Sequence, residues 1–118
     1  MRILVLYEEL STYFVTCISK FSSLYKWEVY IVRKEVNSAA PFIFAIDPGI
    51  KIYDRKDFTE DQLLELVEKI NPDAIFCGGW AYKPYGLIAR RYRGKIPVLL
   101  GFDNKWENTL RQNVAVLL

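Results

Sequence analysis

Short apolar runs that recur along the chain constrain its fold more strongly than any other feature. Residues 2–7, 73–77 and 96–100 are almost continuously apolar, a pattern typical of parallel strands that are buried on both faces of a sheet. Residues 28–33 and 50–53 give two further strand patterns. Helical patterns separate most of these strands, so right-handed crossovers predict an α/β fold with a single Rossmann-like, doubly wound parallel sheet of about five strands in the order 3-2-1-4-5, flanked by helices.

Each predicted helix has its own end signals. Ser11 or Thr12 can cap the first helix. The second begins with a capping box formed by Thr59 and Gln62 and ends before Pro72. A third begins at residues 83–84, where a proline suits the first turn, and stops at Gly94.

The spacing of apolar residues in the first helix predicts which of its faces packs against the sheet. The stripe consists of Phe14, Cys17, Ile18, Phe21 and Leu24. Both cysteines, Cys17 and Cys77, are therefore expected to be small buried hydrophobic residues in a reducing compartment.

Two segments depart from this alternation. Residues 36–49 contain two prolines and a glycine and predict an irregular connection in place of a helix. Residues 114–118 form an apolar helical end without a cap. We therefore expect residues 1–118 to be one N-terminal domain, and a second domain to follow it in the natural chain.

Composition excludes several classes of function. A net charge of +2 is too small to indicate a nucleic-acid partner. The sequence contains no histidine, which excludes proton transfer by imidazole, Ser-His nucleophile pairs and ordinary zinc sites. No Gly-x-Gly-x-x-Gly or P-loop motif follows the first strand, so a dinucleotide or P-loop function is not expected. We accordingly predict no cofactor, and no metal site. No apolar run approaches the roughly 20 residues of a membrane span, and a cytoplasmic location is expected.

Ligands of open parallel sheets bind outside the carboxyl ends of the strands, near the switch in strand order. Three predicted loops reach that edge, after the first, fourth and fifth strands. They contain the candidate substrate-binding residues, which are Glu8, Gly79, Trp80, Asp103, Asn104 and Trp106. Indole rings pack on sugar rings, glycines permit positive φ and close backbone approach, and carboxylate and amide groups bind hydroxyls.

Structural roles compete with these functional ones. Gly79 can shape a turn, Trp80 can cover the sheet edge, and Asp103 or Asn104 can cap the last helix. Glu8 can belong to a solvated loop. The basic cluster at residues 90–93 falls in the last turn of a helix, where cations complement the helix dipole, and the structural interpretation is preferred for it.

Several segments together resemble the N-terminal domain of group 1 (family 4) glycosyltransferases, over essentially the whole chain. The most specific is Asp103-Asn104-Lys105-Trp106-Glu107-Asn108-Thr109-Leu110-Arg111-Gln112. The others are residues 1–7, 36–42, 71–73 and 78–80.

The resemblance implies a GT-B architecture of two facing Rossmann-like domains, in which this half holds the sugar acceptor. The other half would bind the nucleotide-sugar donor and carry a characteristic pair of glutamates. The whole enzyme would transfer a sugar to a glycan or lipid-linked acceptor with retention of configuration and without a metal. This chain alone would be inactive, and its uncovered cleft face favours self-association. Association of the whole protein with a membrane surface stays open. Several branches of the family place a histidine in this domain, and none is present here.

Two other interpretations remain. A receiver-type signalling domain shares the length and strand order, with Glu8 and Glu9 after the first strand and Asp54 at the end of the third. It lacks the small hydroxyl residue that receivers carry after the fourth strand, because Cys77 and Gly78 stand there. The second alternative is a non-enzymatic Rossmann-like binding module.

Overall fold

The computed structural model describes residues 1–35, 47–79, 81–101 and 107–117, with the backbone alone for residues 115 and 116. In this part of the chain a five-stranded parallel sheet has the order β3-β2-β1-β4-β5, which confirms the predicted fold class and strand order. The strands are β1 (Arg2–Leu6), β2 (Glu28–Arg33), β3 (Ile50–Asp54), β4 (Ala74–Cys77) and β5 (Val98–Leu100). The helices are α1 (Thr12–Tyr25), the short 3₁₀ helix η1 (Arg55–Asp57), α2 (Glu60–Ile70), α3 (Lys83–Tyr92) and α4 (Leu110–Leu117).

β1 lies at the centre of the sheet and is hydrogen-bonded on both sides. Val5 aligns with Ile31 of β2 on one side and with Phe76 of β4 on the other. Leu4, Val5 and Leu6 are fully buried, as the apolar run in the sequence predicts. The chain therefore leaves the carboxyl end of β1 in the middle of the molecule.

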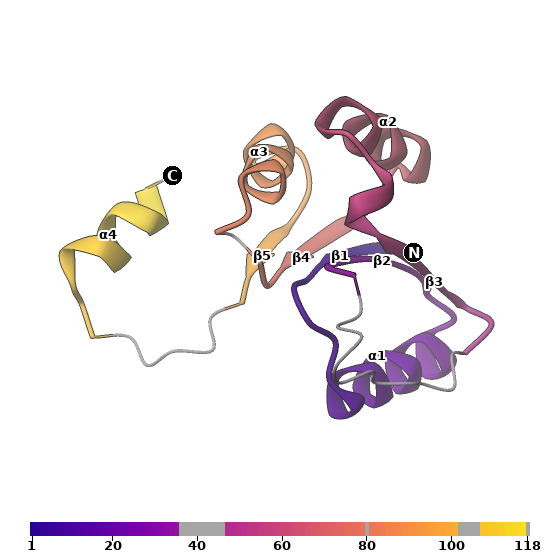
Figure 1. Cartoon of the computed structure of the whole chain (residues 1–118). Helices are drawn as coiled ribbons and strands as arrows, with labels where there is room; N and C mark the ends of the chain where they lie inside the picture. The colour runs from indigo at the N-terminus through magenta and orange to yellow at the C-terminus, as the bar shows by residue number, and fades with distance from the viewer. Residues whose placement is uncertain (36–46, 80, 102–106, 118) are drawn as a thin grey trace.

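Helices cover both faces of the sheet, α1 on one and α2 with α3 on the other (Figure 1). Because successive strand residues point to opposite faces, β1 contributes Val5 to the α1 side and Leu4 and Leu6 to the other. The core on the α1 side contains Val5, Leu10, Val15, Val29, Ile31 and Ile50. The larger core on the opposite side contains Leu4, Leu6, Val32, Leu63, Val67, Ile70, Ile75, Cys77, Tyr85 and Ile88.

The predicted buried stripe of α1 is partly wrong. Val15 and Ser22 are the buried residues of this helix, whereas Phe21 and Leu24 are exposed. The helix is rotated about its axis relative to the prediction, and the exposed Phe21 ring stacks on Tyr25 and Trp27. The rotation also leaves Cys17 exposed, while Cys77 is buried as expected.

The predicted helix ends are mostly correct. Ser11 caps α1 by accepting a hydrogen bond from the Phe14 backbone N–H. Thr59 and Gln62 form the capping box of α2, and Asn71 ends that helix in the left-handed conformation. At the end of α3, Arg91 forms an ion pair with Glu68 of α2, at 2.6 Å. This contact supports the structural interpretation of the basic cluster.

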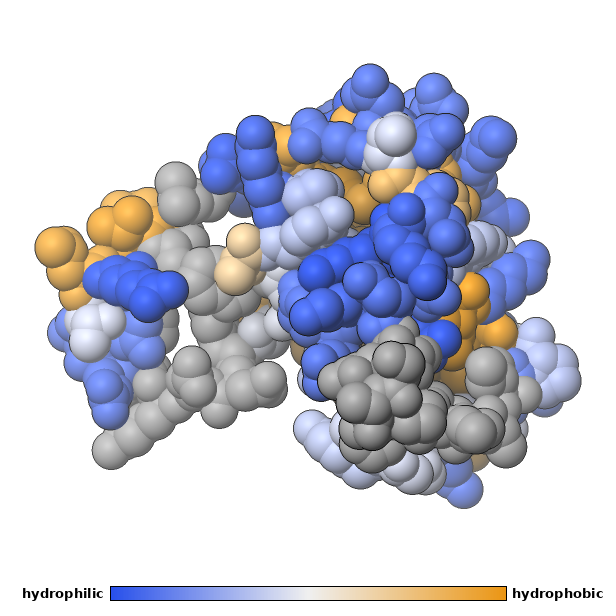
Figure 2. Space-filling view, in the orientation of Figure 1, coloured by the Kyte–Doolittle hydropathy of each residue, from blue (hydrophilic) through white to orange (hydrophobic). Residues whose placement is uncertain are grey.

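α4 lies apart from the sheet, beyond β5 (Figure 1). Its side chains Leu110, Val114 and Leu117 are exposed, and Figure 2 shows hydrophobic surface gathered there. The predicted irregular connection falls largely on residues 36–46, which lie outside the described residues. In the described part of the chain, no helix is both long and apolar enough to cross a membrane.

The capping box of α2 gives a first test of the fold. Thr59→Ala removes the hydroxyl that accepts from the Gln62 N–H, and we expect it to lower the free energy of unfolding by about 1 kcal/mol. Thr16→Ala is the matched control, because Thr16 lies on the exposed side of α1 and its hydroxyl donates to the carbonyl of Thr12, within the same helix. Urea unfolding followed by circular dichroism measures both. Equal losses in the two variants would contradict the role of the capping box.

Candidate functional site

The switch in strand order lies between β1 and β4, because the chain builds the sheet outward from β1 to β3 and then returns to place β4 on the other side of β1. The carboxyl ends of β1, β3 and β4 point to the same edge. The loops that follow them bring together Glu8, Arg55, Gly79 and Tyr82. In open parallel sheets this is the position where ligands bind.

Glu8 and Arg55 form an ion pair at the centre of this edge. Arg55 Nη1 donates to Glu8 Oε1 at 2.8 Å. η1 starts where β3 ends, which places the arginine at the carboxyl edge. The guanidinium lies over the ring of Tyr82, 3.8 Å from its centroid, which is a cation–π geometry. Burial lowers the pKa of Arg55, but the hydrogen bond and charge of Glu8 outweigh that effect, and the pKa lies above its ordinary value.

The backbone that carries Glu8 is held by its neighbours. The buried hydroxyl of Tyr85 on α3 is shared between the Tyr7 carbonyl, at 2.9 Å, and the Val32 carbonyl, at 3.1 Å. The Glu8 carbonyl accepts from the Lys34 N–H at 3.0 Å. The first residues after β1 are thus fixed to the end of β2 and to α3, which pre-organises the Glu8 side chain.

Gly78 and Gly79 allow close packing at this edge. A Cβ at Gly79 would lie 2.9 Å from the Tyr85 ring and 3.1 Å from Glu8 Oε1, and one at Gly78 would lie 2.5 Å from the Tyr7 ring. Neither glycine has a positive φ, which among the described glycines belongs to Gly94. Both glycines therefore leave room for neighbouring side chains of the chain itself, and close approach of a ligand at Gly79 stays a prediction.

A second ion pair lies beside the first. Arg33 at the end of β2 donates through Nε to Asp54 Oδ1 at 2.9 Å. Asp54 and Arg55 are consecutive, so the two pairs follow each other along the edge. Within the described residues, no group of three or more acidic or cysteine side chains is placed to hold a metal ion. Glu8 and Asp54 are thus each paired with an arginine.

The structure places two of the sequence-predicted site residues, Glu8 and Gly79, beside one another, since a Cβ added at Gly79 would lie 3.1 Å from Glu8 Oε1. Trp80, Asp103, Asn104 and Trp106 lie outside the described residues. Arg55, Tyr82 and Tyr85 were not singled out as site residues. Arg55 could have been found, because it follows the third strand directly and the carboxyl ends of all parallel strands meet at one edge.

Part of the motif at residues 103–112 has a structural role. The Gln112 N–H donates to Thr109 Oγ1, and Gln112 Oε1 accepts from the N–H groups of Thr109 and Glu107. This reciprocal pattern is a capping box, the same device that starts α2. Thr109 and Gln112 thus begin α4, and the earlier residues of the motif carry its candidate binding groups.

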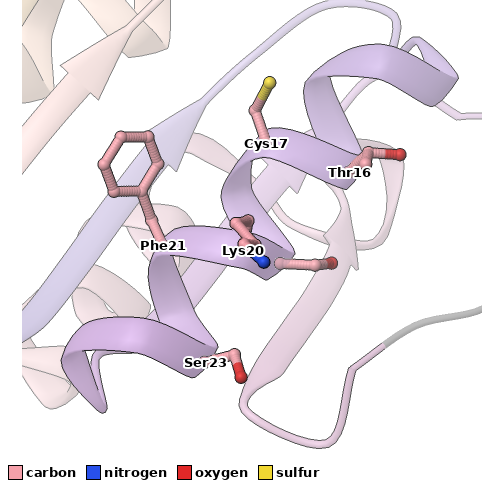
Figure 3. Close-up of a pocket in the computed structure, with 6 residues that line it drawn as sticks. Thr16, Cys17, Lys20, Phe21 and Ser23 are labelled. Atoms are coloured by element: carbon pink, nitrogen blue, oxygen red, sulfur yellow. The ribbon is translucent and has the colours of Figure 1, made fainter.

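An open hollow of about 520 Å³ lies along α1, away from the carboxyl edge (Figure 3). Its described lining comes from a single helix, namely Thr16, Cys17, Ser19, Lys20, Phe21 and Ser23. Ligand sites are usually concave and combine a few polar groups that converge from different elements. The polar groups of the Glu8–Arg55 cluster do converge from different elements, since they come from three loops.

Comparison with known proteins adds no family assignment. No protein-family model matches the chain, and no curated protein matches it. The fold and the geometry of the carboxyl edge are therefore the observations from which a function is argued.

The hydroxyl of Tyr85 gives a test of how the edge is held. Tyr85→Phe keeps the ring and removes the hydrogen bonds to the Tyr7 and Val32 carbonyls, and we expect a loss of about 0.5–1.5 kcal/mol in the free energy of unfolding. Tyr13→Phe is the control, because Tyr13 is 68% exposed. Urea unfolding measures both variants. If the Tyr85→Phe protein were as stable as the control, the Tyr85 hydroxyl would not anchor the backbone at this edge.

The same tyrosine predicts a dependence on alkaline pH. Burial raises the pKa of Tyr85 above its ordinary value of 10.0. The folded state thus holds the phenolic proton more tightly than the unfolded state, whose tyrosines titrate near about pH 10. The stabilisation of the folded state by the protonated Tyr85 hydroxyl is complete below about pH 10 and is lost as the pH rises further. The stability difference between the wild type and Tyr85→Phe should therefore shrink from about pH 8 to about pH 10.5. A difference that stays constant or grows would contradict this assignment.

Proposed function

We propose that this chain is the acceptor-binding domain of a retaining glycosyltransferase of GT-B architecture. It would hold the sugar acceptor at the carboxyl edge, while a second domain would bind the nucleotide-sugar donor. The chain alone would then bind sugar without transferring it. Its contribution to catalysis would be the orientation of the acceptor hydroxyl.

The observation that carries the proposal is the Glu8–Arg55 ion pair, held against Tyr82 and Gly79 at the switch in strand order. A carboxylate accepts hydrogen bonds from hydroxyls, and bonds to a charged acceptor are stronger than those between neutral groups. The sequence resemblance at residues 78–80 and 103–112 supports the same function. These segments follow β4 and β5, whose carboxyl ends lie at this edge.

Binding of sugars to the isolated chain tests the proposal. In ¹⁵N-edited NMR titrations, at least one member of a monosaccharide panel should shift the amide signals of Glu8, Gly79 and Tyr82. The panel contains glucose, mannose, galactose, N-acetylglucosamine, glucosamine and glucuronic acid. Nucleoside diphosphates should leave these signals unchanged, because the donor site belongs to the proposed second domain.

Glu8→Ala should weaken that binding about tenfold or more, since a hydrogen bond to a charged group contributes about 1.5–3 kcal/mol. Glu28→Ala is the matched control, because Glu28 also pairs with an arginine, Arg2, but at the opposite edge of the sheet. The proposal fails if no sugar shifts the three signals. It also fails if acetyl phosphate with magnesium adds a phosphoryl group to Asp54, the result expected of a receiver.

A further inference from the structure

The two ion pairs of the carboxyl edge expose their partners to solvent in the same order. In the first pair the Arg55 side chain is 14% exposed and that of Glu8 is 40% exposed. In the second, Arg33 is 17% exposed and Asp54 is 31% exposed. In both pairs the carboxylate side chain is therefore more exposed to solvent than the arginine side chain.

Most of the Arg55 side chain is buried, and part of its guanidinium is already engaged. Its Nη1 is engaged by Glu8, and one face of its guanidinium is covered by the Tyr82 ring at 3.8 Å. The Tyr85 ring lies 5.7 Å away on the buried side. Burial and pairing thus hold the cation inside, where it fixes the carboxylate rather than meeting the solvent.

Glu8 keeps one oxygen for a ligand. Its hydrogen bond to Arg55 uses Oε1, and Oε2 accepts no hydrogen bond from the described residues. An ionised carboxylate is an acceptor only, so a partner of Oε2 must donate. Hydroxyl and ammonium groups do so, whereas another carboxylate or a phosphate would meet like charge at close range.

We propose that the Glu8 site takes sugars that are uncharged or carry an amine, that it rejects anionic sugars and phosphate, and that Arg55 is the positioning residue which sets this preference. The inference rests on the proposed function and names the class of acceptor that this function would serve. Arg55 acts through Glu8 and does not touch the ligand.

Exposed lysines near this edge do not reverse the preference. Lys34 follows β2, and Lys56 belongs to η1. Their flexible side chains attract anions without fixing an orientation, and salt at about 0.15 M screens exposed charges beyond about 8 Å. The titrations are therefore run at that ionic strength, where the fixed carboxylate decides which ligand is bound.

The experiment compares matched ligands on the wild-type chain by ¹⁵N-edited NMR. Glucose and glucosamine represent the accepted class, and glucuronic acid and inorganic phosphate the rejected class. We expect the accepted ligands to shift the amide signals of Glu8, Gly79 and Tyr82, with dissociation constants about tenfold or more below those of the anions. Equal or tighter binding of glucuronic acid at these signals would overturn the inference but leave the proposed function standing. Failure of every sugar in the panel used for the proposed function would overturn both.

Glu8→Gln sharpens the test, because it keeps the size of the side chain but leaves the positive charge of Arg55 without a neutralising carboxylate. The preference should invert: glucose binding weakens about tenfold and phosphate gains binding at the same signals. Glu28→Gln, in the corresponding pair with Arg2 at the opposite edge, should keep the wild-type preference. A Glu8→Gln protein that still rejects phosphate would contradict the role assigned to this carboxylate.

Arg55 is tested by rescue. Arg55→Met should reduce glucose binding although the side chain does not touch the sugar, and Arg55→Lys should restore part of it, because a lysine also pairs with Glu8. If Arg55 served only to pack on Tyr82, methionine would replace it as well as lysine does. Equal sugar binding in the two variants would therefore refute the positioning role.

Discussion

The pairing of β1 with β2 on one side and β4 on the other is the constraint on which the rest of this structure depends. It buries Leu4, Val5 and Leu6 completely. It also places the switch in strand order beside β1, at its boundary with β4. In the described part of the chain, α2 and α3 cover one face and α1 covers the other. A ligand therefore has its best access at the carboxyl edge of the strands, where the loops carry polar side chains.

Tyr85 connects that central pairing to the candidate site. Its ring belongs to the core on the α2 and α3 side, and its hydroxyl reaches the carbonyls at the ends of β1 and β2. The glycine at position 79 leaves room for this ring and for the Glu8 carboxylate at once. The site is thus an extension of the core, in which packing fixes the backbone and the Arg55 ion pair fixes the side chain that faces solvent.

Sequence patterns predicted the strands of the sheet well, because a short, continuous apolar run such as that of β1 is typical of a strand buried on both faces. They were partly wrong on the face of α1, where Phe14 and Ile18 pack against the core but Phe21 and Leu24 are exposed. Phe21 stacks instead on Tyr25 and Trp27. Sequence patterns also missed Arg55, whose partner Glu8 is 47 residues away along the chain. Such a contact is decided by tertiary structure, and local patterns carry no information about it.

Among the described residues, a sugar ring has two surfaces to compare, the carboxyl edge with Glu8 and the aromatic stack of Phe21, Tyr25 and Trp27. A crystal structure of the chain soaked with a neutral monosaccharide separates them directly. The account predicts electron density for the sugar at the carboxyl edge, with a hydroxyl within hydrogen-bond distance of Glu8 Oε2. Density on Phe21, Tyr25 and Trp27, with the carboxyl edge occupied by water alone, would contradict it.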